Sequence, residues 1–200
     1  MGLFILKYWN NGYYIMNLKF TVFFDIKNLD DFFYKTLLPP LSKKHSVRNY
    51  KCDTLPTLSQ TSNILNCTRI IYKNNKAIVI YEDNLIDGGW VYISSIAKNY
   101  NIRTLYVRLN DENPYPGYYL AYFEKGSERV IYNVKENKWK FYNQGPVAFF
   151  EKDEKYLEKK VSDKFNKEKL ILFCNRIGLD ILDKNFFIPS SRIYCIQRVT

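Results

Sequence analysis

His45 is the only histidine of the chain, and most catalytic triads and most zinc sites need at least one. It lies among lysines in a polar stretch, where a solvated imidazole is the commoner role, so a catalytic or metal-binding His45 is the less favoured interpretation. The sequence contains no glycine-rich phosphate loop of the P-loop or dinucleotide-binding type. Gly88-Gly89 is an isolated pair that we interpret as a turn. We therefore expect no cofactor and no metal.

Carboxylates that lie close together in sequence are candidates for acid–base chemistry. Asp111-Glu112 and the pair Glu124 and Glu128 are the two sets that could be arranged in this way. Both fall in turn-forming sequences, where acidic residues commonly serve solubility, and nothing specific supports a catalytic pair. We expect a protein that is not an enzyme.

The four cysteines are scattered, and no two form a C-x-x-C pair, which excludes a zinc ribbon and a thioredoxin-like motif. Cys174 and Cys195 lie in apolar runs and are expected to pack as small hydrophobic residues. No uncharged apolar stretch of about 18 residues is present, so we expect no membrane span. The apolar start of the chain stops at Lys7 and is not a signal peptide, which favours a cytoplasmic protein with reduced thiols. Met1 and Met16 both remain candidates for the native start, and residues 1–16 are interpreted as a non-core N-terminal extension.

The net charge of +10 is concentrated in the first 80 residues, where 11 Lys and Arg face 4 Asp and Glu. Such a balance suits an acidic partner, which can be nucleic acid, anionic lipid or an acidic protein. Residues 41–66 are polar and show no clear period, so we predict a long loop there. Within it we expect partner-binding residues at Lys43, Lys44, Arg48, Tyr50 and Lys51. A solvated loop without a partner is the alternative interpretation.

The elements that must position these residues are clearest between Asn101 and Glu151. Short β-rich runs are separated there by turn residues and by no helix-length connection, which predicts an antiparallel meander. Its strands are expected at residues 102–109, 118–124, 129–134 and 139–142.

The rest of the chain supplies further strands and several helices. Strands are predicted in residues 17–26, in a hairpin over residues 68–81 and in residues 191–199. Helices are predicted over residues 28–35 with Asn28 as a cap, over residues 90–99, and as a pair between residues 150 and 177 that is broken near residues 162–164. We assign Glu151–Lys155 and Asp163–Lys167 as i,i+4 pairs on the solvated face of that pair. The fold class that follows is α+β: one domain over residues 1–200, mainly antiparallel sheet (meander 102–142), with helices packed on one face.

Basic and aromatic residues alternate in the meander, a pattern found in platforms that stack the bases of single-stranded nucleic acid. The residues concerned are Arg103, Tyr106, Arg108, Trp139, Lys140 and Tyr142. Aromatic side chains on strands more often pack against their neighbours, and we favour that interpretation.

The meander and the segment after it resemble small orphan immunity proteins that are found beside bacterial polymorphic toxins, including those of contact-dependent growth inhibition systems. The resemblance covers about half of the chain and rests on the spacing of residues 103–108, a Pro-Gly turn, Ala121-Tyr122-Phe123, Arg129-Val130-Ile131-Tyr132, Trp139-Lys140-Phe141, Gly145, Phe149-Phe150-Glu151, Tyr156 and residues 177–181. It implies a cytosolic protein that neutralises a cognate toxin by tight 1:1 binding. The basic balance would suit an acidic toxin, or one that is blocked away from its active site. The alternative function is nucleic-acid binding through the basic N-terminal part.

Overall fold

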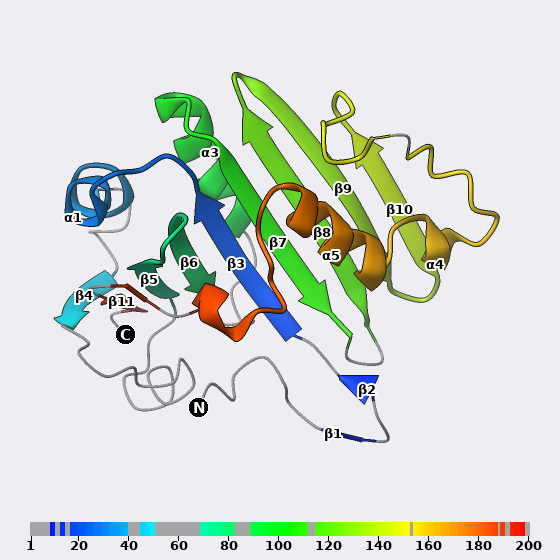
Figure 1. The fold of residues 1–200 in the computed structure, drawn as a ribbon, viewed down its shortest axis with the longest axis horizontal. Coiled ribbons are helices and arrows are strands. Elements are labelled where there is room, and N and C mark those ends of the chain that lie inside the picture. The colour runs from blue at the N-terminus through cyan, green and yellow to red at the C-terminus, as the bar shows by residue number, and fades with distance from the viewer. Residues whose placement is uncertain are drawn as a thin grey trace.

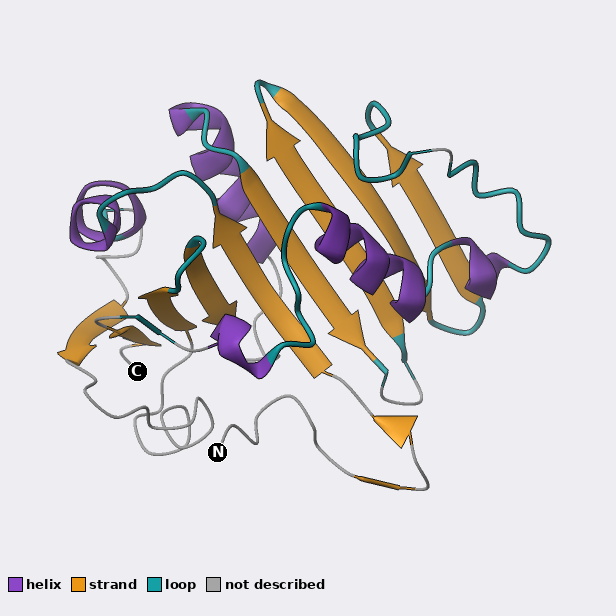
Figure 2. Ribbon diagram, in the orientation of Figure 1, coloured by secondary structure: helices purple, strands orange, loops and turns teal. Residues whose placement is uncertain are grey.

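The computed structural model describes residues 9–10, 13–14, 17–39, 45–50, 69–82, 89–111, 115–152, 154–187, 189–190 and 193–198. Its centre is a nine-stranded sheet in the order β10-β9-β8-β7-β3-β6-β5-β11-β4, in which every neighbouring pair is antiparallel (Figures 1 and 2). The strands are β3 (Asn17–Phe23), β4 (His45–Tyr50), β5 (Arg69–Lys73), β6 (Ile78–Glu82), β7 (Thr104–Asn110), β8 (Gly117–Glu124), β9 (Ser127–Lys135), β10 (Trp139–Gln144) and β11 (Ile193–Arg198). The predicted α+β class, dominated by an antiparallel sheet, is confirmed.

Strands β7 to β10 form the predicted meander, because each is the hydrogen-bonded neighbour of the next along the chain. The hairpin of β5 and β6 and the C-terminal strand β11 are also confirmed. Two short strands, β1 (Trp9–Asn10) and β2 (Tyr13–Tyr14), pair only with each other, and the nine-stranded sheet begins at Asn17. The interpretation of residues 1–16 as a non-core extension stays a prediction.

Helices cover both faces of the sheet, whereas we expected them on one. The elements are α1 (Leu29–Phe32), which continues into the π-helical turn η1 (Phe33–Leu37), then α3 (Gly89–Tyr100), α4 (Val161–Lys164), α5 (Lys167–Arg176) and the short 3-10 turn η2 (Lys184–Phe187). In Figure 1, α5 lies in front of the meander and α3 lies behind it. We name the sides accordingly, as the α5 face and the α3 face.

Two hydrophobic cores explain why both faces need a cover. Leu18, Phe20 and Val22 of β3 pack with residues of α5 on one side. Phe23 packs with α1, η1 and α3 on the other. The same split occurs in β6, where Val79 belongs to the first core and its neighbours Ile78 and Ile80 to the second. A central strand with apolar residues on both faces has to be buried on both, since each fully buried large side chain is worth about 1.5–3 kcal/mol.

Two further expectations about local structure are wrong. Residues 150–152 and 154–160 are not helical, and the two helices of this region are α4 and α5. Residues 162–164, where we placed the break, belong to α4, and the break lies at residues 165–166. Residues 45–50, expected within a long loop, form the edge strand β4, which pairs with β11. The polar sequence of β4 shows no apolar alternation, and its place in the sheet is set by backbone pairing to its partner strand.

Replacing Asn28 tests the local stability of the first helix. The Oδ1 atom of Asn28 accepts hydrogen bonds from the amides of Asp30 (2.9 Å) and Asp31 (3.1 Å), as an N-cap should. We expect Asn28→Ala to lower the free energy of unfolding by about 1 kcal/mol in urea titrations. The matched control Asn75→Ala, an exposed residue of the β5–β6 turn, should change it by less than about 0.5 kcal/mol. An equal effect of the two variants would contradict the capping role.

Candidate functional site

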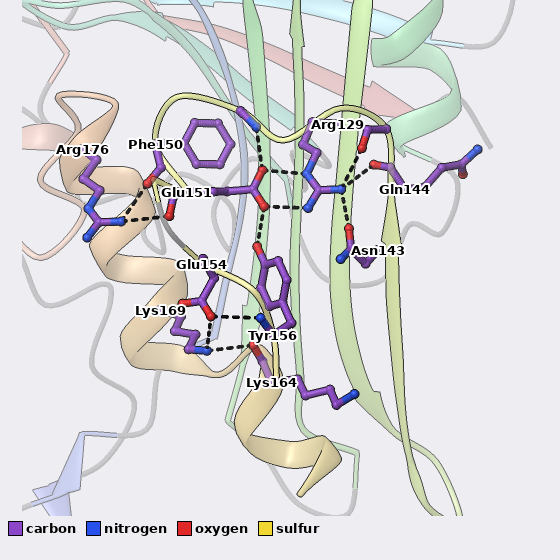
Figure 3. A network of polar contacts seen from close by, with 12 residues as sticks. Arg129, Asn143, Gln144, Phe150, Glu151, Glu154, Tyr156, Lys164, Lys169 and Arg176 are labelled. Atoms are coloured by element: carbon purple, nitrogen blue, oxygen red, sulfur yellow. Dashed lines mark hydrogen bonds and ion pairs between the residues drawn. The ribbon is translucent and has the colours of Figure 1, made fainter. Parts of the chain in front are cut away.

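A buried ion pair joins β9 to the segment that follows β10. Arg129 points to the α5 face of the sheet, as Ile131 does two residues later. Its Nε atom donates to Oε1 of Glu151 at 2.7 Å, and its Nη2 atom donates to Oε2 at 2.6 Å (Figure 3). The side chains of Arg129 and Glu151 are only 3% and 0% exposed, so this bidentate pair is screened from water.

The remaining polar atoms of the pair also have partners. Nη1 of Arg129 donates to Oδ1 of Asn143 and to the carbonyl oxygens of Gln144 (3.0 Å) and Gly145 (3.1 Å). Glu151 accepts from the amide of Ala148 (2.8 Å) and from the hydroxyl of Tyr156 (2.6 Å) (Figure 3). Two buried charges are tolerated only when they are paired and hydrogen-bonded in this way.

Two groups of the network, Arg129 and Tyr156, have raised pKa values. Burial works against the charged form of Arg129, but its hydrogen bonds to Glu151 and the negative charge there outweigh that effect, so the pKa of Arg129 lies above its ordinary value. Burial, and then the hydrogen bond to Glu151, raises the pKa of the Tyr156 hydroxyl well above its usual range. The tyrosine therefore keeps the proton that it donates. The four hydrogen bonds to the carboxylate of Glu151 fix its position and that of the chain around it.

The network holds residues 145–152 and 154–157 in place, and we call these residues the clamped loop. Helix α5 holds it from the other side, because Nη1 of Arg176 donates to the carbonyl oxygen of Phe150 at 2.9 Å (Figure 3). Lys169 of α5 also donates from Nζ to Oε1 of Glu154 at 3.0 Å. The loop therefore has fixed contacts to the sheet and to the helix.

The clamped loop exposes large apolar side chains at three positions. Val147 is 64% exposed, Phe149 is 57% exposed and Leu157 is 80% exposed. Beside Phe149 lies a shallow pocket of about 230 Å³, which Tyr122, Pro146 and Ala148 also line. Apolar side chains held in solvent by a constrained loop are typical of a surface that a partner covers.

The sequence did contain a signal for this network. Arg129 stands at an inward position of a strand, in alternation with Ile131 and Asn133, where an apolar residue is usual. A cation at such a place requires a buried acid. We assigned Glu151 to a solvated helical face paired with Lys155. That assignment is wrong, because Glu151 is 1% exposed and pairs with Arg129.

The five predicted partner-binding residues are placed only in part. Arg48 and Tyr50 belong to β4, opposite Cys195 and Ile193 of β11. Lys43, Lys44 and Lys51 lie outside the described residues, as do the side chains of β4, including that of His45. Their role in binding stays a prediction.

The candidate carboxylate pairs are not assembled in the part of the chain that the structure describes. Glu128 lies opposite Phe123, one position away from Glu124 on the pleated strand β8, so the two glutamates project to opposite faces of the sheet. Glu128 instead pairs with Lys98 of α3 at 2.7 Å. Asp111 pairs with Lys167 at 2.6 Å, while Glu112 lies outside the described residues.

The remaining sequence features that fall on described residues have structural roles. Cys174 is a free thiol in the core, and burial raises its pKa to about 12, so it packs as a small hydrophobic residue as expected. The side chain of Cys195 is not among those described. Within the described ranges, no three His, Cys, Asp or Glu side chains are grouped so as to hold a metal ion. No described helix is long and apolar enough to cross a membrane.

Comparisons of the chain with protein-family models, with curated proteins and with solved structures gave no match.

Proposed function

We propose that the chain is a non-enzymatic immunity protein that binds a cognate bacterial toxin domain 1:1 in the cytosol and blocks it. The observation that carries the proposal is the clamped loop, which presents Val147, Phe149 and Leu157 to solvent from a fixed backbone. A preorganised apolar surface loses little conformational entropy on binding and supplies the anchors that dominate protein interfaces.

The sequence resemblance is a second line of support for the proposal. Arg129, Glu151 and Tyr156 are among the residues that carry the resemblance, and they meet in the buried network. The network fixes the clamped loop, so the resembling residues include those that build the proposed contact surface. An interface with a toxin should bury about 1,200–2,000 Å² in total.

A growth assay tests the proposed function directly. The toxin domain encoded beside this chain's gene is produced from an inducible promoter in a bacterial host, with and without the chain. We expect the chain to restore colony formation and to form an equimolar complex with the purified domain in light-scattering measurements. Unrestored growth together with the absence of a complex would overturn the proposal.

Substitutions on the clamped loop should separate binding from folding. Leu157→Ser and Val147→Ser remove exposed apolar side chains, and we expect each to weaken toxin binding by about tenfold or more. Their melting temperatures should stay close to that of the parent protein, because exposed apolar side chains contribute little to stability. Calorimetric titration measures the affinity.

The matched control for these variants is Leu182→Ser, between α5 and η2. Leu182 is 55% exposed, and it lies outside the clamped loop. This variant should bind the toxin domain as the parent does. Equal losses of affinity in all three variants would argue against the clamped loop as the contact surface.

A further inference from the structure

A straight row of side chains crosses five strands on the α3 face of the sheet, beyond the part that α3 covers. The strand registers place Lys19 opposite Arg108, Arg108 opposite Tyr119, Tyr119 opposite Tyr132 and Tyr132 opposite Tyr142. Opposed residues of antiparallel strands project to the same side, so all five share one face. Lys19 is buried, Arg108 and Tyr142 are exposed, and Tyr119 and Tyr132 are half-buried. We call the last four residues, Arg108, Tyr119, Tyr132 and Tyr142, the tyrosine row.

The tyrosine rings of the row cover one another's faces. The rings of Tyr119 and Tyr132 are 5.4 Å apart between centroids with an interplanar angle of 5°, and those of Tyr132 and Tyr142 are 4.8 Å apart with an angle of 13°. Two rings that lay side by side in one plane would overlap at these centroid distances. The nearly parallel rings are therefore stacked face to face with an offset. Tyr106 and Tyr119 form a T-shaped pair, with centroids 5.4 Å apart.

This geometry bears on the choice between nucleic acid and protein. A base-stacking platform needs free ring faces, but Tyr132 is stacked on both sides by Tyr119 and Tyr142, and Tyr119 has Tyr132 on one side and a T-shaped contact with Tyr106. The interpretation that these aromatic residues pack against their neighbours is therefore confirmed for Tyr106 and Tyr142. Of the other residues in that predicted pattern, Trp139 stacks on Tyr118, which packs against the core on the α5 face, and Arg103 lies over the ring of Phe24.

The charge on and beside this face is positive. Lys98 and Lys140 are neutralised by Glu128 and Glu136 respectively. Arg108 is exposed, and no described residue forms an ion pair with it. Burial, and then the charge of Glu128, raises the pKa of Tyr119 to about 12, so its hydroxyl remains a hydrogen-bond donor at physiological pH. A guanidinium beside a run of phenol groups is suited to carboxylates and carbonyl oxygens.

We propose that the tyrosine row binds an acidic surface of the partner protein, with a partner carboxylate on Arg108. This inference rests on the proposed function, because the partner is the toxin domain. Four strands about 4.8 Å apart make the row about 15–20 Å long, and the same-face repeat along a strand is roughly 6.6 Å, so the footprint is roughly 100–130 Å². That is less than a quarter of the ~800 Å² per partner in a standard interface, so the row forms one patch of a larger contact. A second copy of the chain fits poorly, since it would bring two Arg108 side chains and two net charges of +10 together.

Titration of the purified toxin domain against single-site variants tests the row. We expect Arg108→Glu to weaken binding by about tenfold or more and to reduce the salt dependence of the association rate, because charge pairing acts strongly on association. Tyr142→Thr, which retains β propensity at the 38% exposed end of the row, should weaken binding by about fivefold. The matched controls are Lys125→Glu in the β8–β9 turn and Tyr115→Thr, 65% exposed before β8, and both should bind as the parent does.

Each other result of that experiment overturns the inference in a recognisable way. If the parent and both row variants bind equally well, the row is not in the interface and the proposed function survives on the clamped loop. If the parent does not bind the toxin domain, both proposals fall. A 20-residue oligothymidylate that binds the parent at low salt but not Arg108→Glu would assign the row to nucleic acid. A parent dimer in light scattering that Arg108→Glu dissociates would assign it to a second copy of the chain.

Discussion

Glu151→Leu should lower the free energy of unfolding by about 3–5 kcal/mol, because it leaves the guanidinium of Arg129 buried without its counter-charge. The 3% exposure of Arg129 prevents water from replacing the lost carboxylate. Two hydrogen bonds to Arg129, one from the Ala148 amide and one from the Tyr156 hydroxyl are removed together. Urea denaturation followed by tyrosine and tryptophan fluorescence gives the change in stability.

Two comparisons make this expectation specific to the buried pair. Glu136→Gln breaks the exposed Lys140–Glu136 pair, whose side chains are 53% and 60% exposed, and should cost less than about 1 kcal/mol. The double variant Arg129→Leu/Glu151→Leu should be less damaging than the sum of the two single changes, since neither charge is then left alone. Strict additivity of the two changes would contradict the coupling that the geometry implies.

Gly145→Ala is expected to be the second most damaging change, for a backbone reason. Gly145 has a φ of +88°, and a Cβ atom built on it would lie 2.0 Å from the carbonyl oxygen of Glu128. The left-handed conformation alone costs a non-glycine residue about 1–2 kcal/mol, and the clash is with main chain that cannot rotate away. With an overpacking cost of about 1–3 kcal/mol added, the total loss of stability should reach roughly 2–5 kcal/mol in the same urea assay.

Gly126→Ala is the matched control for this change. Gly126 has a similar φ of +79°, but a Cβ atom there meets nothing within 4 Å. It should therefore show the conformational cost alone, about 1–2 kcal/mol. If the two alanine variants are equally stable, the backbone approach of the clamped loop to β9 is looser than the structure indicates.

The sequence could predict the elements whose signals are local. Alternation of period two located β3 and the meander, apolar spacing of three and four located α3, and Asn28 marked the start of α1. Each of these signals depends on residues within a few positions of one another. The pleat or the helical turn brings those residues to one face whatever the rest of the chain does.

Other elements depended on partners that are distant in sequence. The strand β4 exists through its pairing with β11, nearly 150 residues later. Strands β3 and β6 are central in the sheet and apolar on both faces. Helices are therefore needed to cover the sheet on both faces. The burial of Glu151, which we expected on a solvated helical face, depends on Arg129 of β9, 22 residues earlier.

The same distinction between local signals and long-range contacts applies to the candidate sites. The sequence by itself determined an α+β chain, the strands that carry Arg108, Tyr132 and Tyr142, and the positive charge of the whole. Only the tertiary structure decided that Arg129 and Glu151 meet, and that three tyrosines and Arg108 from four strands form one row. The physical reason is that strand register and the burial of charge are set by contacts across the sheet. Such contacts join residues whose spacing along the chain has no fixed relation to their distance in space.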